Sequence, residues 1–323
     1  MYAKQKSNQN KHGKISSRAI SNKGKYGIIY HMETLHSPVL LSEVMASLDP
    51  KLGESYLDLT AGYAGHAEAI LAVTQNYKNA VLVDRDDYAV KYLQAKYSSS
   101  EAPDILHMDF YSAALQLIEC GKTFDIILLD LGVSSPQLDN ADRGFSFMKD
   151  GPLDMRMDKR QNFSAETIVN HASMAELTEI FEKYGEMSPG FARKVAREIV
   201  LHRPFETTLE LADRIKGNAK HSRIHPATKA FQAIRIKVND ELGEIEKTLP
   251  LIPRLLNPGG RVAIITFHSL EDRLVKDYFR EASGLGEESE LTIVNKTPIV
   301  AESEELVINP RSRSAKMRVA KRK

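Results

Sequence analysis

Short apolar runs alternate with helical patterns along much of the chain. The runs, at 55–59, 80–84, 104–109, 124–132 and 259–267, have the length and continuity of buried strands. The segments that follow the first three runs (HAEAILAV, YAVKYLQAKY and YSAALQLIE) repeat their apolar residues at helical spacing. Strands that alternate with helices predict an α/β fold built on a doubly wound parallel sheet.

The pattern changes between about residues 140 and 240, where helical segments follow one another without strands. In the last of these segments Phe231, Ile234 and Val238 share one helical face, which predicts a stripe packed in a core. We therefore expect a helical insertion over 140–240, within a sheet domain formed by 34–139 and 241–323.

The composition is that of an ordinary globular protein, with 42% hydrophobic and 27% charged residues, but the charges are segregated. Residues 1–32 and 309–323 each hold seven Lys and Arg and no acidic residue, which leaves the chain between them with a net charge of −13. Two basic ends on an acidic body indicate contact with a polyanion, although solvation alone explains the N-terminal charge equally well. Residues 1–33 are expected to form a disordered basic leader; a targeting leader and a natural start at Met32 are the alternatives.

Further observations narrow the class of protein. No apolar stretch approaches the roughly 20 residues of a membrane span, and the N-terminus lacks the apolar core of a secretion signal. The single cysteine, Cys120, excludes internal disulfides and a cysteine-based zinc cluster. No grouping of metal ligands demands an ion, and we expect the chain to work in the cytoplasm.

A glycine-containing turn follows the first predicted strand, in DLTAGYAGHAEAIL (58–71). Gly62 and Gly65 allow the backbone to approach a ligand and to turn into a helix. Asp84 ends the second strand, where a carboxylate accepts hydrogen bonds from ribose hydroxyls, and acids also follow the third and fourth strands. The turn lacks the third glycine of dinucleotide sites, and no phosphate-binding loop is present. These features favour S-adenosylmethionine, which contains adenosine but no phosphate.

Four longer stretches carry a family resemblance; they begin DLGVSSPQLD (130–158), HPATKAFQ (225–242), FHSLEDR (267–276) and NPRSRSAK (309–318). From residue 36 to its end the chain resembles the bacterial methyltransferases that modify the exocyclic N4 of a cytidine in small-subunit (16S) ribosomal RNA. The resemblance implies a Rossmann-like methyltransferase sheet, an insertion that recognises RNA, S-adenosylmethionine as cofactor and a target near the decoding centre. It implies small-subunit ribosomal RNA as partner, within the 30S subunit or naked, and leaves the oligomeric state open.

The resemblance also implies a set of cofactor-binding residues. They are Ala64, Gly65, His66, Asp84, Phe110, Asp130 and Gln137. Relatives usually carry glycine where this chain has Tyr63, and often at Ala64, which puts the geometry of the turn in question. The sequence Ser188-Pro189-Gly190 is a second departure, expected to reshape a turn in the insertion.

The chemistry requires a group that accepts or orients the amine, and a base taken out of its helix. Asp130 is the candidate acceptor, and the equal alternative is that it only contacts the cofactor or stabilises the loop. Candidates for RNA contact are Phe145, Arg156, Arg235, Asn239, His268, Arg311 and Arg313, with Phe147, Lys316 and Arg318 beside them. For most of them, core packing or a surface ion pair is the competing interpretation. Ser269 and Asp272 match a helix-capping box.

Other functions remain open from the sequence. An amino-methyltransferase that acts on another nucleic acid shares these motifs, and a non-catalytic RNA-binding or ribosome-assembly factor shares the fold without the reaction. A nicotinamide dehydrogenase fits least, because the glycine fingerprint is incomplete.

Overall fold

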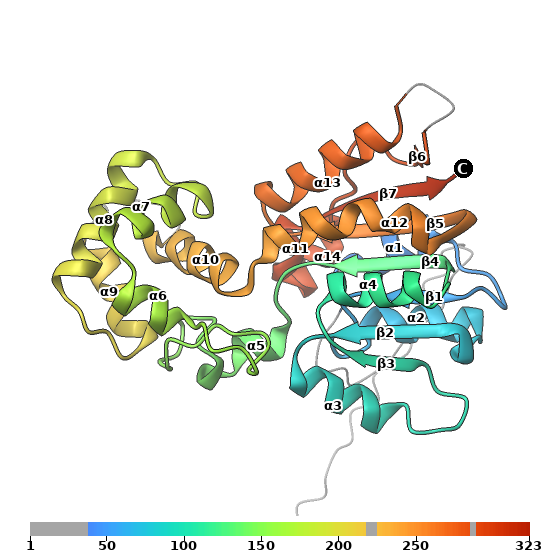
Figure 1. Ribbon diagram of the computed structural model, residues 1–323, viewed down its shortest axis with the longest axis horizontal. Helices are drawn as coiled ribbons and strands as arrows, with labels where there is room; N and C mark the ends of the chain where they lie inside the picture. The colour runs from blue at the N-terminus through green and yellow to red at the C-terminus, as the bar shows by residue number, and fades with distance from the viewer. Residues whose placement is uncertain (1–37, 218–224, 285–288) are drawn as a thin grey trace, which may run out of the picture. The chain divides into compact units, whose positions relative to one another are not determined.

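A seven-stranded sheet organises the computed structural model, which describes residues 38–217, 225–284 and 289–323 (Figure 1). The strands are β1 (Tyr56–Asp58), β2 (Ala80–Asp84), β3 (Asp104–His107), β4 (Phe124–Asp130), β5 (Leu256–Thr266), β6 (Leu291–Ile293) and β7 (Lys316–Arg322). Their order is β3-β2-β1-β4-β5-β7-β6. The first five strands in this order are parallel to one another. β7 pairs antiparallel with β5, and β6 pairs antiparallel with β7. The predicted doubly wound α/β sheet is confirmed, while the predicted leader lies outside the described residues.

The order of the strands places a crevice beside β1. The chain steps outward from β1 to β2 and β3, then returns to place β4 on the other side of β1. The loops after β1 and β4 therefore diverge at neighbouring carboxyl ends, where ligands bind in open parallel sheets. Asp58 pairs in register with Leu128, so the loop after β1 begins close to Asp130.

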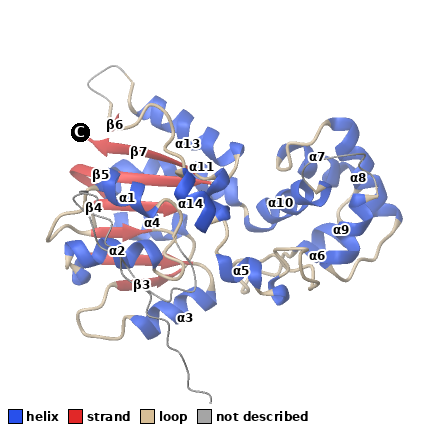
Figure 2. Ribbon diagram, turned by 180° about the vertical axis from the view of Figure 1, so that it is seen from behind, coloured by secondary structure: helices blue, strands red, loops and turns tan. Residues whose placement is uncertain are grey.

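Helices cover both faces of the sheet. One face carries α1 (Leu41–Leu48), α2 (Gly65–Thr74) and α3 (Asp87–Lys96); the other carries α4 (Phe110–Glu119), α11 (Glu241–Thr248), α12 (Ile252–Leu255) and α13 (Ser269–Ala282). Ile126 of β4 packs in the core with Ile70, and the next residue, Ile127, packs in the opposite core with Phe279. Successive strand residues face opposite sides, which explains the unbroken apolar runs. Figure 1 shows α4 in front of the strands, and Figure 2, the view from the opposite side, shows α2 in front of them.

The last two strands were not predicted. β6 has three residues, and β7 (KMRVAKR) contains no apolar run. The alternation of Met317 and Val319 with basic residues places the apolar side chains in the core. Arg318 is buried because its Nε donates to Asp272 Oδ1 over 2.7 Å.

A group of helices with its own core occupies the expected insertion. They are α6 (Ala165–His171), α7 (Met174–Lys183), α8 (Pro189–Leu201), α9 (Thr208–Lys216) and α10 (Pro226–Asn239). The predicted core stripe of Phe231, Ile234 and Val238 is confirmed. The described part of 140–239 contains one isolated β-bridge, Pro152–Thr207, and no longer strand. The boundaries of the two domains stay a prediction.

Shorter elements connect these parts. They are η1 (Tyr77–Asn79), α5 (Ser135–Asp139), η2 (Ala141–Arg143), η3 (Leu249–Leu251), α14 (Ser303–Ile308) and η4 (Pro310–Ser314). The unusual Ser188-Pro189-Gly190 starts α8, with Pro189 in the first turn, where its missing N–H costs nothing. Among the described helices, none combines the length and apolar character that crossing a bilayer requires.

Candidate active site

The loop between β1 and α2 turns through two left-handed residues. Gly62 has φ 51° and Ala64 has φ 65°. Glycine adopts this region freely, whereas it costs an alanine roughly 1–2 kcal/mol. α2 begins at Gly65, where a Cβ would lie 2.6 Å from Cγ of Pro38. Close packing therefore requires glycine at 65, and Ala64 keeps a glycine-like conformation at some cost in stability.

Tyr63 lies between the two left-handed residues and packs on α3. Its ring centroid is 5.2 Å from that of Tyr92. Burial raises the pKa of its phenol to about 12, so the ring stays neutral at physiological pH. The backbone keeps the tight turn on both sides of Tyr63, so this departure from relatives is compatible with a ligand-binding loop.

Asp84, at the end of β2, joins two loops of the crevice. Its Oδ2 accepts a hydrogen bond from the Gly62 amide over 2.8 Å, and its Oδ1 accepts one from the Asp86 amide over 2.8 Å. Burial raises the pKa of this carboxyl to about 6. Each carboxylate oxygen accepts more than one hydrogen bond, so Asp84 retains capacity for further donors. The ribose contact expected from the sequence stays a prediction.

Asp130, at the end of β4, has an unusual environment. Its Oδ1 is buried and has no hydrogen-bond partner among the described residues. Its Oδ2 lies 3.7 Å from Nδ1 of His66, whose Nε2 lies 2.9 Å from the carbonyl oxygen of Val39. Burial, with the nearby carboxylates of Asp58 and Glu271, raises the pKa of Asp130 well above its usual range. A carboxylate in this state accepts protons or hydrogen bonds readily.

Asp58 is a third carboxyl at the strand ends, which the sequence did not single out as a site residue. Its Oδ2 accepts a hydrogen bond from the Tyr56 hydroxyl over 2.7 Å, and its Oδ1 accepts one from the Thr60 amide over 3.1 Å. Burial raises its pKa to about 7. The adjacent strands β2, β1 and β4 thus each end in an acid, buried at Asp58 and partly buried at Asp84 and Asp130. Such a concentration of acids with raised pKa values is typical of functional sites.

Comparison with known sequences decides the family. A family model described as the MraW methylase family matches residues 33–323. This chain belongs to that family. Membership in the MraW family confirms the predicted enzyme class and cofactor: the protein is an S-adenosylmethionine-dependent methyltransferase.

Curated relatives agree in name and length. A protein of Cyanothece sp. named ribosomal RNA small subunit methyltransferase H is 47% identical over 293 residues, which cover 90% of this chain and 95% of the relative. Proteins of the same name from Acidobacterium capsulatum and Halothermothrix orenii are 43% and 41% identical, and each match covers 89% of this chain and 98% of the relative.

Two further residues expected at the cofactor site of this MraW-family protein are buried. Phe110 begins α4 and packs in the core beneath the crevice. Gln137 of α5 accepts a hydrogen bond from the Ser134 amide over 2.9 Å and donates one to Asp86 over 2.7 Å. Both ends of its amide are therefore bonded within the protein, and Gln137 positions α5 beside the loop after β2.

The candidates in the first loop of the insertion lie in structural contacts. Phe145 is buried, and Phe147 packs 4.9 Å from the ring of Phe231. Arg156 donates through Nε to Asp154 over 2.6 Å and through Nη1 to the carbonyl oxygen of Gln161 over 2.8 Å. The structure therefore gives the aromatic pair a place in the core and Arg156 a local ion pair.

Arg235 and Asn239 of α10 are engaged as well. Arg235 donates through Nε and Nη2 to the two carboxylate oxygens of Glu241, both over 2.9 Å. Asn239 accepts from the amide of Met157 and donates to the carbonyl oxygen of Met155, both over 2.8 Å. Asn239 therefore ties the end of α10 to the loop at the start of the insertion.

His268 caps α13 in place of the predicted residue. The sequence predicts a capping box at Ser269 and Asp272, but the box is formed one position earlier, by His268 and Glu271. Glu271 Oε2 accepts from the Phe267 amide over 2.7 Å, and its Oε1 lies 3.1 Å from His268 Nε2. The prediction was wrong by one residue because histidine is not a usual N-cap.

His268 and Glu271, together with Glu241, form a cluster of the residue types that bind cations, which the sequence did not indicate. Glu241, His268 and Glu271 each place one ligand atom within 4.8 Å of the others; no such set of three or more exists elsewhere in the described ranges. Arg235 already balances one carboxylate and His268 lies against the other, so the cluster is explained as a buried ion-pair network.

The C-terminal candidates differ in exposure. Arg311 is exposed and its Nη2 donates to Asp139 Oδ1 over 2.7 Å. Arg313 is exposed on η4. Lys316 and Arg318 both pair with Asp272. Of these four cations only Arg318 is buried, whereas the side chains of Arg311, Arg313 and Lys316 are accessible.

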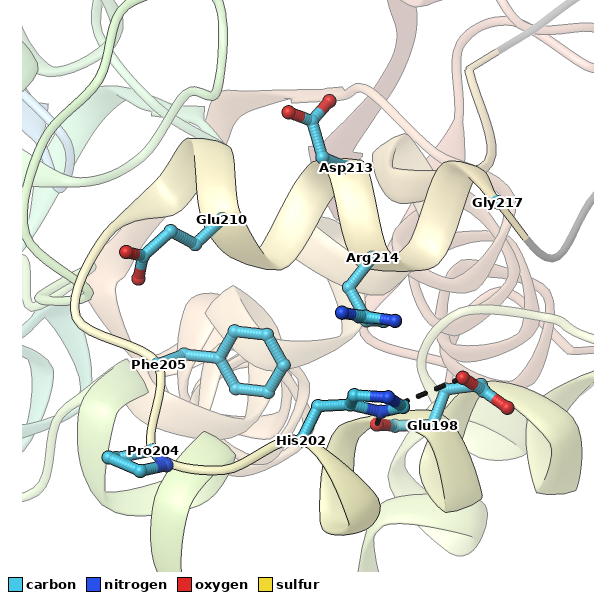
Figure 3. Close-up of a pocket in the computed structure, with 8 residues that line it drawn as sticks. All are labelled: Glu198, His202, Pro204, Phe205, Glu210, Asp213, Arg214 and Gly217. Atoms are coloured by element: carbon cyan, nitrogen blue, oxygen red, sulfur yellow. Dashed lines mark hydrogen bonds and ion pairs between the residues drawn. The ribbon is translucent and has the colours of Figure 1, made fainter.

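A pocket of about 500 Å³ lies within the insertion rather than in the crevice (Figure 3). It is lined by Glu198, His202, Pro204, Phe205, Glu210, Asp213, Arg214 and Gly217. Arg214 points toward His202, whose Nδ1 lies 2.9 Å from the Glu198 carbonyl oxygen, while Asp213 points away. Glu210 accepts from the Thr207 amide and caps α9. The pocket carries opposed charges and none of the strand-end acids, so the crevice remains the candidate active site.

Proposed function

We propose that this chain transfers a methyl group from S-adenosylmethionine to the exocyclic N4 of a cytidine in small-subunit ribosomal RNA. One observation carries the proposal: Asp130 holds a buried carboxylate oxygen without a hydrogen-bond partner in the described structure, at the end of β4 and beside the glycine turn. The name of the curated relatives supports the RNA substrate, and the motifs in the sequence support N4 of cytidine.

The crevice fits the cofactor. A Cβ built on Gly62 would meet only the carbonyl oxygen of Thr60, at 3.9 Å, so the space over the turn is open. Asp84 can accept from the ribose hydroxyls. The other residues proposed to hold it are Ala64, Gly65, His66 and Phe110. When bound, S-adenosylmethionine supplies an electrophilic methyl group.

Asp130 suits an exocyclic amine. The lone pair of cytosine N4 is delocalised into the ring, so the amine must be oriented and must lose a proton. Asp130 Oδ1 can accept an N–H hydrogen bond, and the raised pKa makes this carboxylate a stronger base than an exposed one. The imidazole of His66 lies next to this carboxylate, with Nδ1 3.7 Å from Asp130 Oδ2.

The RNA has to present an unpaired base. A cytidine within a helix is out of reach of Asp130, so the base must be flipped or come from a single-stranded region. Arg311 and Arg313 are the proposed phosphate contacts, because they are exposed cations. We propose the 30S subunit as the partner and the cytoplasm, where subunits assemble, as the compartment.

The test is methyl transfer from radiolabelled S-adenosylmethionine to small ribosomal subunits that lack the modification, and to naked RNA in parallel. Mass spectrometry then identifies the labelled nucleoside. We expect N4-methylated cytidine, and at least ~100-fold less of it with Asp130→Ala. Asp104→Ala, at the exposed amino end of β3, is the control and should retain the wild-type rate.

Two results would redirect the proposal. Label on another nucleoside or another nucleic acid would assign a different substrate. Cofactor binding without transfer to either RNA would favour the non-catalytic ribosome-assembly factor.

A further inference from the structure

A buried ion pair joins the loop after β2 to the first loop of the insertion. Asp86 Oδ2 accepts hydrogen bonds from Arg143 Nη1 over 2.8 Å and from Gln137 Nε2 over 2.7 Å. Asp86 and Arg143 are only 3% and 2% exposed. Burying two charges carries a desolvation cost, and removing one partner of such a pair is strongly destabilising. The proposed function has so far given neither residue a role.

Arg143 holds the insertion loop at both ends. Its Nη2 donates to the carbonyl oxygens of Arg156, over 3.0 Å, and Met157, over 3.3 Å. Its own carbonyl oxygen accepts from the amide of Met155 over 3.0 Å. The guanidinium carbon also lies 5.2 Å from the ring centre of Tyr88 on α3. One side chain thus fixes the path of residues 143–157 relative to the sheet.

On the other side the network reaches the cofactor turn. The Asp86 amide donates to Asp84, whose second carboxylate oxygen accepts from the Gly62 amide. A second link runs in parallel: Arg85 Nη1 donates to the Asn239 carbonyl oxygen over 3.0 Å, at the end of α10. Hydrogen bonds therefore run without a break from the glycine turn, through residues 84–86, to the segment that starts the insertion.

We propose that Arg143 is a positioning residue that couples the cofactor site to the RNA-facing insertion. This inference rests on the proposed function, under which ribose hydroxyls bind at Asp84, and it adds that the insertion contacts the RNA, as the family resemblance implies. Ordering of residues 84–86 by the cofactor then orders the loop that Arg143 holds, and RNA on that loop orders residues 84–86. Such coupling is reciprocal: each ligand strengthens the binding of the other by the same factor.

The test uses the full-length enzyme and S-adenosylhomocysteine, whose affinity is measured by calorimetry with and without unmodified small-subunit RNA. In the wild type, RNA should strengthen this binding by a factor within about 5–150-fold. Arg143→Lys keeps the charge opposite Asp86 but loses the fork that reaches two carbonyl oxygens. The coupling ratio is the affinity for S-adenosylhomocysteine with RNA divided by the affinity without RNA. In Arg143→Lys we expect this ratio to fall to about one. The affinity without RNA should stay near the wild-type value, and KM for RNA should rise.

Arg160→Lys is the matched control. Arg160 lies just after the segment 143–157 but is exposed, and it pairs with Asp158 through Nη2 over 2.7 Å. It should keep the wild-type ratio. If Arg143→Lys does not fold, the double variant Asp86→Asn with Arg143→Gln removes both charges together and should show the same loss of coupling.

The outcomes separate the two proposals. A wild-type ratio of one, or an unchanged ratio in both Arg143 variants, overturns the inference even where methyl transfer is normal. A variant that is merely less stable but keeps the ratio overturns it too. Coupling in the wild type without any methyl transfer contradicts the proposed function instead.

Discussion

Polar side chains lie inside two regions of the molecule: the ends of β1, β2 and β4, and the junction of α10 with α11. The two regions differ in how many hydrogen bonds these side chains make. At the strand ends, burial raises the pKa of Asp58 to about 7 and leaves Asp130 Oδ1 without a partner in the described structure. At the junction, Arg235 makes two hydrogen bonds to Glu241, and Asn239 bonds three backbone groups.

The difference separates chemistry from positioning. A buried carboxylate that lacks a counter-ion costs folding free energy, and such groups concentrate where a reaction needs them. A buried group whose bonds are all made holds segments in register. Asp130 belongs to the first kind and Asn239 to the second.

Asp130→Asn should show the largest effect, and on activity alone. The amide keeps the shape of the side chain but accepts a proton far less readily, so we expect a loss of about 10²–10⁴-fold in kcat. Because burial already disfavours the charged form, the free energy of unfolding should stay the same or rise. Urea unfolding and methyl-transfer kinetics on one preparation check both. A large loss of stability would place Asp130 with the structural groups.

Arg235→Met should show the opposite pattern. This change removes the counter-ion of the buried Glu241 carboxylate. Breaking a buried ion pair costs about 3–5 kcal/mol of stability. Urea unfolding measures the loss, and adding Glu241→Gln should restore most of it. Arg160→Met, which removes an exposed pair, serves as the control. Full stability in Arg235→Met would mean that the junction is not held by this ion pair.

The pH dependence of stability tests the strand-end carboxyls directly. Asp58 titrates near 4 in the unfolded chain and at about 7 in the folded protein, so only the folded state holds this proton between those values. Its contribution is full below pH 4 and falls by about 1.4 kcal/mol per pH unit as pH rises to about 7. The difference in unfolding free energy between the wild type and Asp58→Asn, measured by urea at pH 5 and pH 8, should show this fall. If the difference in unfolding free energy between the two proteins did not change with pH, the pKa of Asp58 would not be raised by folding.

The sheet was predictable where the sequence pattern is local. β2 occupies 80–84, as its apolar run predicts, and the strand-end acids follow from the runs that precede them. β7 escaped prediction because its burial depends on Asp272, which lies 46 residues away from Arg318 along the chain. Long-range ion pairs leave no periodic signal in a single sequence.

The candidate site was predictable to a similar extent. Asp84 and Asp130 lie at the crevice because strand topology alone brings them there. The engagement of Gln137 with Asp86, 51 residues away, and of Asn239 with Met157, 82 residues away, required the folded structure. A polar residue in a sequence motif gives the same signal whether its side chain contacts a ligand or the backbone of another segment, so only its partners in the structure decide its role.

The smallest expected effect concerns the turn itself, at Ala64. Ala64→Gly removes left-handed strain of roughly 1–2 kcal/mol, but it adds backbone freedom to the unfolded chain and removes a buried methyl group, each worth about 0.5–1 kcal/mol. The net change in unfolding free energy should therefore stay within about 1 kcal/mol, and S-adenosylhomocysteine affinity should be unchanged. Ala64→Val places a branched side chain at a buried position whose backbone must be left-handed. It should therefore lower both the unfolding free energy and the affinity for S-adenosylhomocysteine. If valine were tolerated as well as glycine, the loop would have another conformation available, and the tight turn would not be what positions the cofactor beside Asp130.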